Sequence, residues 1–365
     1  MDDQPPPQPT PQGDRSVGRQ LSLALVTFGA TMLLLAGLNA ILGGAGAADR
    51  APRAGPRTSV TASSSDASAV GPPATATRPS PPPTTTPTTA PTPTAAPTQR
   101  PEPVLVGAGD IADCDSRGDE ATAALLDDID GTVFTAGDNV YESATEAAFR
   151  DCYEPSWGRH LARTRPAAGN HDWASGTIRA YLDYFGARAA GPEGETWYAY
   201  ELGAWRIIVL DSDCGAVGGC DPDSAQGRWL AETLSGSDAR CTLAVWHHPR
   251  FSSGYHGNDA GVAPFWKALY EAGADVIING HDHDYERFAP QDPSGTEDRA
   301  RGLREFVVGT GGRALRRFYD IQPNSELRAS LDHGVLALTL HEGSYSWQFH
   351  AATTDFSDRG TARCH

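Results

Sequence analysis

Short apolar runs recur along the last two thirds of the chain and predict the strands of a buried sheet. Each run is three to six residues long, and all but the last are rich in Val, Ile, Leu or Phe. Runs of this length and content are typical of strands that are covered on both faces. They occupy residues 104–106, 132–135, 207–210, 243–246, 276–278, 306–308, 335–340 and 345–350.

Between several of these runs, apolar residues recur at helical spacing. The pattern predicts helices over residues 120–129, 225–234 and 263–272. Leu230 and Leu234, for example, fall on one face of the second of these helices. Strand and helix alternate through most of the region, and strands alone follow near its end. This order predicts an α/β domain with mixed sheets over residues 104–365, a length that allows one sizeable core.

The pattern before residue 104 is different. Residues 21–42 contain no charged side chain and are long enough to span a bilayer as a helix. Arg15 and Arg19 precede this segment, so the positive-inside rule places residues 1–20 in the cytoplasm and the catalytic part outside it. We predict a transmembrane anchor at 21–42. The alternative is a cleaved signal sequence and a secreted protein, because Ala45-Gly46-Ala47 resembles a signal-peptidase site.

Residues 43–103 consist mostly of Pro, Thr, Ser and Ala, with almost no large apolar side chains. A segment of this composition cannot bury enough apolar surface to build a core. Its Thr-Pro repeats favour an extended polyproline conformation. We therefore predict a disordered linker or stalk that holds residues 104–365 away from the membrane.

Charge and cysteine content narrow the class of protein. The chain has a formal net charge of -17 and a single lysine, Lys267, and we expect no basic cluster in the folded part. This balance argues against nucleic acid as a partner. All cysteines lie after residue 104, and an even number in an exported chain indicates disulfides.

Among the possible pairings, Cys214 with Cys220 is favoured because glycines separate them in a short loop. The remaining pairs would then be Cys114 with Cys152 and Cys241 with Cys364. Zinc binding by cysteine is the competing interpretation. It is disfavoured because the chain has no C-x-x-C pair.

Potential metal ligands follow four of the predicted strands. Asp110, Asp138, His247 and His281 each come at or shortly after an apolar run. In α/β proteins, side chains just beyond strand ends meet at one edge of a sheet, where binding sites usually lie. Carboxylate and imidazole groups gathered in this way predict a two-metal hydrolytic site.

Further donors lie close to these positions. Tyr141 follows Asp138 by three residues, and a phenolate ligand requires a strongly Lewis-acidic cation, usually ferric iron. Asn170 offers an amide oxygen suited to a hard cation. His281 and His283, two positions apart, can both face one centre. Taken alone, a tyrosine here could equally be a core residue, and the Gly-Asn and Gly-Asp pairs could be ordinary turns.

Two more histidines need a separate assignment. His247 and His248 are adjacent, so in an extended segment they point to opposite sides and only one of them is expected to be a ligand. His256 lies further along a loop and could reach the mouth of the site. By itself it would be an ordinary surface histidine.

In their order along the chain, these motifs resemble those of the calcineurin-like metallophosphoesterases, and within them the purple acid phosphatases. The wider superfamily usually opens with Asp-x-His, but Asp110-Ile111-Ala112 lacks the histidine and Tyr141 compensates for it, as in the purple branch. The last motif also continues with the Tyr-Glu-Arg of that branch. The matching segments are 109–110, 137–141, 169–172, 247–249 and 280–287.

The resemblance implies a fold, a ligand set and two further roles. The fold is a four-layer α/β/β/α sandwich of two mixed sheets. His256 would contact the substrate phosphate or protonate the leaving group, and His171 would be an outer phosphate contact. The metals would be Fe(III) with divalent Fe, Zn or Mn. One would be held by Asp110, Tyr141 and His283, the other by Asn170, His247 and His281, with Asp138 bridging them.

The function implied is that of an extracytoplasmic, metal-dependent phosphoric ester hydrolase similar to acid phosphatases. We expect a small phosphomonoester as the substrate, attacked by a metal-bound hydroxide. Two alternatives remain at this point. One is a phosphodiesterase acting on nucleotides or lipid headgroups, and the other is a non-catalytic surface binding module.

Overall fold

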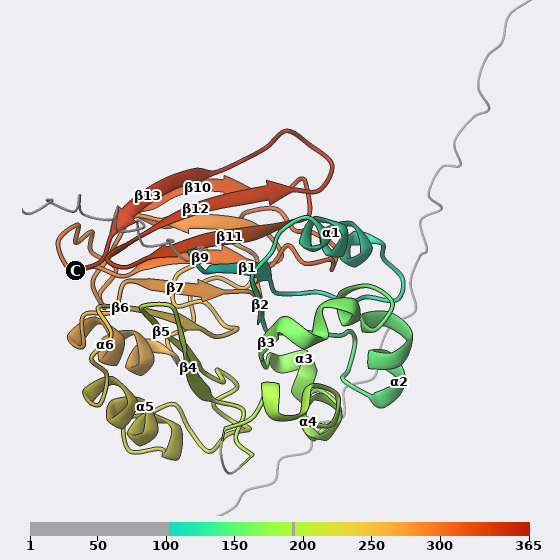
Figure 1. The fold of residues 1–365 in the computed structure, drawn as a ribbon, viewed down its shortest axis with the longest axis horizontal. Helices are drawn as coiled ribbons and strands as arrows, with labels where there is room; N and C mark the ends of the chain where they lie inside the picture. The colour runs from blue at the N-terminus through green and yellow to red at the C-terminus, as the bar shows by residue number, and fades with distance from the viewer. Residues whose placement is uncertain (1–101, 192–193) are drawn as a thin grey trace, which may run out of the picture. The chain divides into compact units, whose positions relative to one another are not determined.

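The computed structural model describes residues 102–191 and 194–365 (Figure 1). The predicted anchor or signal segment and nearly all of the predicted linker lie outside these ranges. Within the ranges, no helix has both the length and the apolar character needed to cross a membrane.

Two mixed sheets form the domain. The six-stranded sheet has the order β13-β12-β11-β1-β2-β3, in which β1, β2 and β3 are parallel and the other neighbours are antiparallel. Its strands are β1 (Val104–Ala108), β2 (Thr132–Ala136), β3 (Thr164–Ala167), β11 (Gly334–His341), β12 (Ser344–Ala351) and β13 (Arg359–Arg363).

The seven-stranded sheet has the order β10-β8-β9-β7-β6-β5-β4. Here β5, β6, β7 and β9 are parallel, while β4, β8 and β10 each run antiparallel to their neighbours. The strands are β4 (Tyr198–Leu202), β5 (Trp205–Val209), β6 (Cys241–Val245), β7 (Val276–Asn279), β8 (Tyr285–Phe288), β9 (Arg304–Val308) and β10 (Ser325–Ala329).

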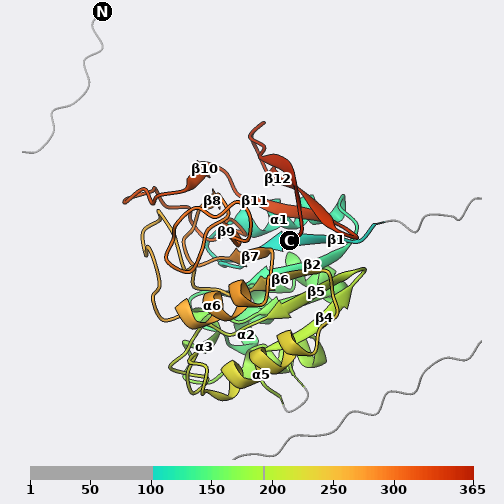
Figure 2. The ribbon, with the colours of Figure 1, turned by 90° about the vertical axis from the view of Figure 1, so that its left-hand side faces the viewer.

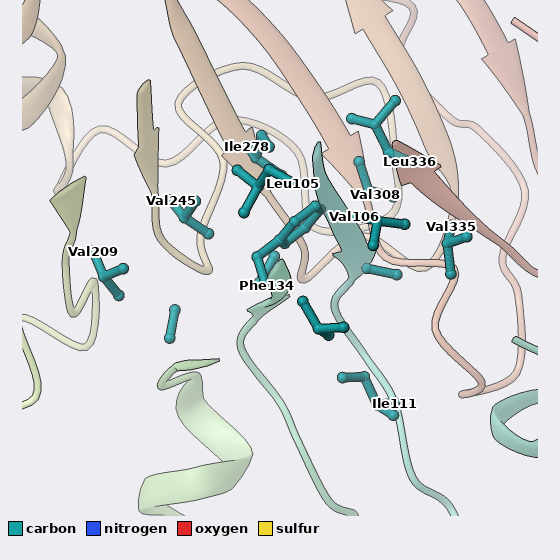
Figure 3. Close-up of a cluster of buried hydrophobic side chains, with 14 of the residues drawn as sticks. Leu105, Val106, Ile111, Phe134, Val209, Val245, Ile278, Val308, Val335 and Leu336 are labelled. Carbon is teal, nitrogen blue, oxygen red and sulfur yellow. The ribbon is translucent and has the colours of Figure 1, made fainter. Parts of the chain in front are cut away.

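The main core joins the two sheets. Figure 3 shows Leu105 and Phe134 of the six-stranded sheet near Ile278 of the seven-stranded sheet, and all three belong to one cluster of buried apolar residues. A second cluster covers the other face of the seven-stranded sheet, where Ile208 and Ile277 pack with residues of α5 and α6. Burial on both faces explains why the central strands consist of continuous apolar runs.

Helices flank the sheets. Helices α5 and α6 pack against each other, and Figure 2 shows them together on one side of the domain. Helix α1 packs instead against β11. The helices are α1 (Gly118–Asp127), α2 (Glu146–Ala148), α3 (Asn170–Trp173), α4 (Arg179–Phe185), α5 (Ala225–Ser235) and α6 (Ala263–Glu271). Short segments of other helix types cover Phe149–Tyr153, Trp157–Arg163 and Gly186–Arg188.

The predicted α/β class with two mixed sheets is confirmed. Every predicted strand and every predicted helix is present, with ends shifted by a few residues. The sequence did not predict β3, β4, β8, β10 and β13, nor the short helices α2, α3 and α4.

Three disulfides join the described cysteines in the pairs that the sequence favoured. Cys214–Cys220 closes a loop of only 6 positions, whereas Cys241–Cys364 spans 123 positions and ties the C-terminal end of the chain to the start of β6. Cys114–Cys152 spans 38 positions. No described cysteine remains free.

Candidate metal centre

The segments that follow β1, β2, β6 and β7 bring the predicted ligands together. Asp110 and Asp138 follow β1 and β2 of one sheet, and His247 and His281 follow β6 and β7 of the other. Asp110, Asp138 and His281 have positive φ angles of 60°, 50° and 72°. Non-glycine residues rarely adopt this left-handed conformation, and such strained positions tend to cluster at functional sites.

Glycines next to these residues allow the close approach. A Cβ atom on Gly137 would lie 2.4 Å from Nδ1 of His247, and one on Gly169 would lie 2.3 Å from Oδ1 of Asp138. Gly107 and Gly109, before Asp110, make room for a neighbouring strand and not for the cluster. A Cβ at these positions would instead meet the carbonyl oxygens of Phe134 and Ala136, so the small residues allow close packing of the neighbouring strand.

The Tyr141 hydroxyl lies between the two aspartates. It is 2.7 Å from Oδ1 of Asp110 and 2.9 Å from Oδ2 of Asp138. A phenol has one proton to donate, so it cannot fully satisfy both carboxylates. Burial and the two carboxylates raise the pKa of Tyr141 well above its ordinary value. A strongly charged cation would therefore be required to bind Tyr141 as a phenolate.

His247 and His283 direct their Nε2 atoms toward this carboxylate pair. Nδ1 of His247 lies 2.8 Å from the carbonyl oxygen of Ala136, and Nδ1 of His283 lies 2.9 Å from that of Ala314. When the Nδ1–H group donates a hydrogen bond to a carbonyl oxygen, the lone pair of Nε2 is left to bind a metal. This arrangement is common in metal sites. Nε2 of His247 is 3.3 Å from Asp138, and that of His283 is 3.5 Å from Asp110.

His281 faces the site through its other ring nitrogen. Its Nδ1 lies 3.2 Å from Nε2 of His247. Its backbone N–H donates to Oδ2 of Asp110 at 2.8 Å, which fixes the segment against the end of β1. Asp110 and His281 are 171 positions apart in the sequence, so this contact depends on the complete fold.

Asn170 and His171 lie at the start of α3. The Oδ1 atom of Asn170 is buried and has no hydrogen-bond partner among the described residues. An orphaned buried oxygen is costly unless a ligand satisfies it. The backbone N–H of His171 donates to Oδ1 of Asp138 at 2.8 Å, and its ring centroid lies 4.4 Å from that of Tyr141.

The charges of the site are strongly coupled. Burial raises the pKa of Asp110 to about 7, although the charge of His247 opposes the shift. Burial alone would lower the pKa of His247, but the Asp138 carboxylate outweighs it and raises this pKa to about 10. For Asp138, burial acts to raise the pKa, but the charge and hydrogen bond of His247, together with those of His171, outweigh burial and lower this pKa. Next to the buried carboxylates, His247 therefore keeps both of its ring protons when no metal is bound. A bound cation could supply the positive charge in place of one of these protons.

The donor atoms fit a metal site. One ligand atom from each of Asp110, Asp138 and His247 lies within 4.8 Å of the others. Carboxylate, amide and phenol oxygens with imidazole nitrogens suit iron, zinc or manganese. The orphaned oxygen of Asn170 adds an independent reason to expect a ligand. Six of the seven predicted ligands thus lie in one cluster, and Asn170 lies in the chain directly before His171, which bonds Asp138 of that cluster. The individual roles of the ligands remain predictions.

His256 lies at the exposed rim of this cluster. Its ring centroid is 4.2 Å from that of His281, and its Nε2 lies 2.8 Å from Nη1 of Arg316. Asp282 holds the segment by accepting the backbone N–H of His256 at 2.7 Å and the hydroxyl of Ser252 at 2.5 Å. His256 therefore has a fixed position beside the predicted ligands.

Three residues near the site were not predicted from the sequence. Asp282 and Arg316 position or contact His256, as described above. The ring of His248 packs 4.3 Å from that of His281 and its Nδ1 lies 2.8 Å from Oγ of Ser212. It is therefore close to the cluster although its ring nitrogen is already bonded. Asp282 and His248 had a local signal, since Asp282 lies between His281 and His283 and His248 lies next to His247, whereas Arg316 had none.

Comparison with known proteins decides the family. A family model described as calcineurin-like phosphoesterase matches residues 104–285. The chain belongs to the calcineurin-like phosphoesterase family.

Curated relatives support a purple acid phosphatase-like branch of that family. Purple acid phosphatase 21 of Arabidopsis thaliana is 27% identical over 263 residues, covering 60% of this chain and 57% of its own. A probable inactive purple acid phosphatase 1 from the same plant is 26% identical over 257 residues, covering 60% and 41%. The uncharacterized protein Rv2577 of Mycobacterium tuberculosis (strain ATCC 25618 / H37Rv) is 28% identical over 183 residues, covering 40% and 35%. The chain thus spans roughly a third to just over half of these relatives.

Solved structures show the same fold. The purple acid phosphatase PPD1 of yellow lupin (Lupinus luteus) seeds has a TM-score of 0.56 and 19% identity, with 73% of this phosphoesterase chain and 55% of the lupin chain covered. GAP50, the anchor in the inner membrane complex of Plasmodium, has a TM-score of 0.56 and 15% identity, with 73% and 89% covered.

Proposed function

We propose that this phosphoesterase hydrolyses phosphomonoesters outside the cytoplasm, using a dinuclear metal centre. The observation that carries the proposal is the convergence of Asp110, Asp138, Tyr141 and the imidazoles on one buried cluster at the strand ends. Two cations in such a site would hold phosphate oxygens and lower the pKa of a water molecule. This chemistry needs no nucleophilic serine or cysteine from the chain.

Each ligand has a proposed place. Asp138 would bridge the two cations, and the backbone N–H of His171 fixes the direction of its carboxylate. One cation, Fe(III), would be held by Asp110, Tyr141 and His283. The other, divalent Fe, Zn or Mn, would be held by Asn170, His247 and His281.

His256 would serve the substrate. Its place at the exposed rim, next to the ring of His281, suits contact with the phosphate or delivery of a proton to the leaving alcohol. The carboxylate of Asp282 keeps His256 in that position by accepting the backbone N–H of His256. His171, with its ring against Tyr141, would contact the phosphate from the other side.

The proposed location outside the cytoplasm rests on the disulfides. Such bonds persist mainly in oxidising compartments. Three of them in one domain therefore favour a protein that folds outside the cytoplasm, either anchored or secreted.

A phosphodiesterase is the second candidate. Tyr255, beside His256, and Tyr319, beside Tyr255, are 56% and 55% exposed, so this part of the rim faces solvent, where a second substituent on the phosphate could lie. A non-catalytic role is the outcome to be considered if the site binds metal without turnover, since one relative bears the name of a probable inactive enzyme.

The test combines metal analysis and a visible spectrum of the full-length protein with hydrolysis of 4-nitrophenyl phosphate and bis(4-nitrophenyl) phosphate. We expect about two metals per chain, a tyrosinate-to-iron absorption band, and faster turnover of the monoester. Tyr141→Phe should abolish the band. Tyr153→Phe is the matched control, because Tyr153 is a buried tyrosine whose hydroxyl has no partner among the described residues.

Each other outcome has a defined meaning. Turnover with about two metals but no band would retain the phosphoesterase and reject the ferric assignment. Faster diester hydrolysis would favour the second candidate. A folded protein that binds no metal and hydrolyses neither compound would contradict the proposed function.

A further inference from the structure

The loop between β9 and β10, residues 309–324, crosses the candidate metal centre. Backbone hydrogen bonds fix it there. The N–H of Arg313 donates to the carbonyl oxygen of Asp110 at 2.9 Å, and the N–H of Arg316 donates to that of His283 at 2.9 Å. The loop also contains Arg317, so the expectation that the folded part has no basic cluster is wrong for this segment. The site of this acidic protein thus has arginines along one side.

Arg313 and Arg316 differ in how their charges are compensated. Arg313 forms ion pairs with Asp113 and Glu142, and its guanidinium lies 4.6 Å from the Tyr141 ring centroid. Its charge is therefore already balanced by carboxylates. Arg316, by contrast, forms no ion pair with any described carboxylate within the 4.0 Å limit that defines the other pairs.

The side chain of Arg316 points toward the substrate side of the site. Its Nη1 lies 2.8 Å from Nε2 of His256, and its guanidinium carbon lies 4.9 Å from the ring centroid of Tyr255. The ring of His256 in turn packs 4.2 Å from that of His281. Arg316 is therefore a partly exposed cation, one side chain away from a predicted metal ligand.

We propose that Arg316 binds the phosphoryl group of the substrate together with His256 and favours dianionic monoesters over monoanionic diesters. This inference rests on the proposed function. A guanidinium presents several N–H donors in a planar fork that matches phosphate oxygens. Only one nitrogen of the Arg316 guanidinium is bonded to His256, so others can reach an anion. The local cation also offsets the repulsion that a net charge of -17 exerts on phosphate.

Removal of the side chain tests this role without removing the loop. Arg316→Ala retains the backbone N–H that donates to His283, so metal content should be unchanged. The matched control is Arg317→Ala, since Arg317 is the next residue, is exposed, and stacks on the Tyr319 ring at 5.0 Å. Binding of inorganic phosphate to the metal-loaded, full-length protein is measured by calorimetry, alongside kcat and KM for the two nitrophenyl esters.

We expect Arg316→Ala to weaken phosphate binding and raise the KM of the monoester by about 10-fold to 100-fold, the range of a charge-assisted hydrogen bond. The diester should be affected less. Arg316→Lys should restore part of the affinity, because lysine supplies charge without the fork. Arg317→Ala should remain within about threefold of the wild type, as expected for an exposed charge.

A second variant separates direct binding from support of His256. In a His256→Ala background, Arg316→Ala should still weaken phosphate binding if the guanidinium contacts phosphate itself. No further loss in that background would reduce Arg316 to a positioning residue and overturn the proposal, as would unchanged phosphate binding in the single variant. Failure of the proposed function would look different, because the wild type would bind phosphate through Arg316 but hydrolyse neither ester.

Discussion

The protonation state of a single buried residue in this domain depends on a few contacts. Asp119 of α1 is an example outside the metal centre. It is buried, and the hydroxyl of Ser156 donates to its Oδ2 at 2.5 Å. Burial raises the pKa of Asp119 to about 6, while the hydrogen bond from Ser156 limits the rise. The folded state therefore holds a proton at pH values where an unfolded aspartate has released it.

This assignment predicts a pH-dependent effect of Ser156→Ala. With a folded pKa of about 6 and an ordinary value of 3.8, the contribution of Asp119 to stability falls as pH rises through this interval. Removal of the donor should raise the folded pKa further, because the hydroxyl favours the ionised form. The loss in free energy of unfolding should be about 1–3 kcal/mol above pH 7 and smaller near pH 4. Denaturant unfolding at both pH values measures it, and an equal loss at both would contradict the assignment.

The control is the same substitution in an Asp119→Asn background. An amide does not titrate, so the effect of Ser156→Ala should then be independent of pH.

At this scale, the sequence predicted the residues that carry their own signal. Asp110, Asp138 and the histidines of the last motif follow apolar runs in short, recognisable segments. Arg316 has no such signal, since its contact with His256 joins two loops that are 60 positions apart. The pattern of a loop does not indicate which of its arginines will lack a carboxylate partner.

Among the elements, the turn between β2 and Asp138 is constrained both by its backbone conformation and by its surroundings. Gly137 has a φ of +83°, and a Cβ there would meet the ring of His247. Gly176, after α3, has nearly the same φ of +82°, but a Cβ there would meet nothing within 4 Å. The two glycines therefore share nearly the same φ, which would strain any other residue, and differ in the space around them.

We predict different results for alanine at these two positions. Gly176→Ala should cost about 1–2 kcal/mol of unfolding free energy for the left-handed backbone alone and leave metal content unchanged. Gly137→Ala should cost more and reduce metal content, because His247 has to move. Thermal unfolding and metal analysis of both variants test this. Equal metal content in the two variants would show that His247 tolerates displacement.

The elements that the sequence missed lack the apolar signal of the central strands. β10 and β13 lie at sheet edges, and their residues are mostly half-buried or exposed. β8 includes the charged residues Glu286 and Arg287, and charged residues in a buried strand need partners. In the fold, Ser253 donates to Glu286 and Arg287 pairs with Asp358. These partners come from distant parts of the chain, which a local pattern does not reveal.

At the scale of the whole molecule, each disulfide should stabilise the folded domain according to the length of chain that it encloses. In the chain-entropy model, a longer loop loses more freedom in the unfolded state when it is closed. Cys241–Cys364 encloses 123 positions and Cys214–Cys220 only 6. The first should therefore stabilise the domain more than the second.

We predict that Cys241→Ala with Cys364→Ala lowers the free energy of unfolding by about 4–5 kcal/mol, and Cys214→Ala with Cys220→Ala by about 2 kcal/mol. Denaturant unfolding of the two double variants measures the difference. A loss that is equal, or larger for the short loop, would mean that native contacts of the Cys214–Cys220 loop outweigh chain entropy.

The long separation between the predicted ligands has a consequence for how the site is filled. The backbone N–H of His281 reaches Asp110 across 171 positions, and the cluster draws on both sheets. Of the ligands, only short neighbouring sets such as His281 with His283 are close together in an unfolded chain. A high-affinity site therefore cannot precede the folded domain. The choice of metal is thus made late, from whatever cations surround the protein where its folding is completed.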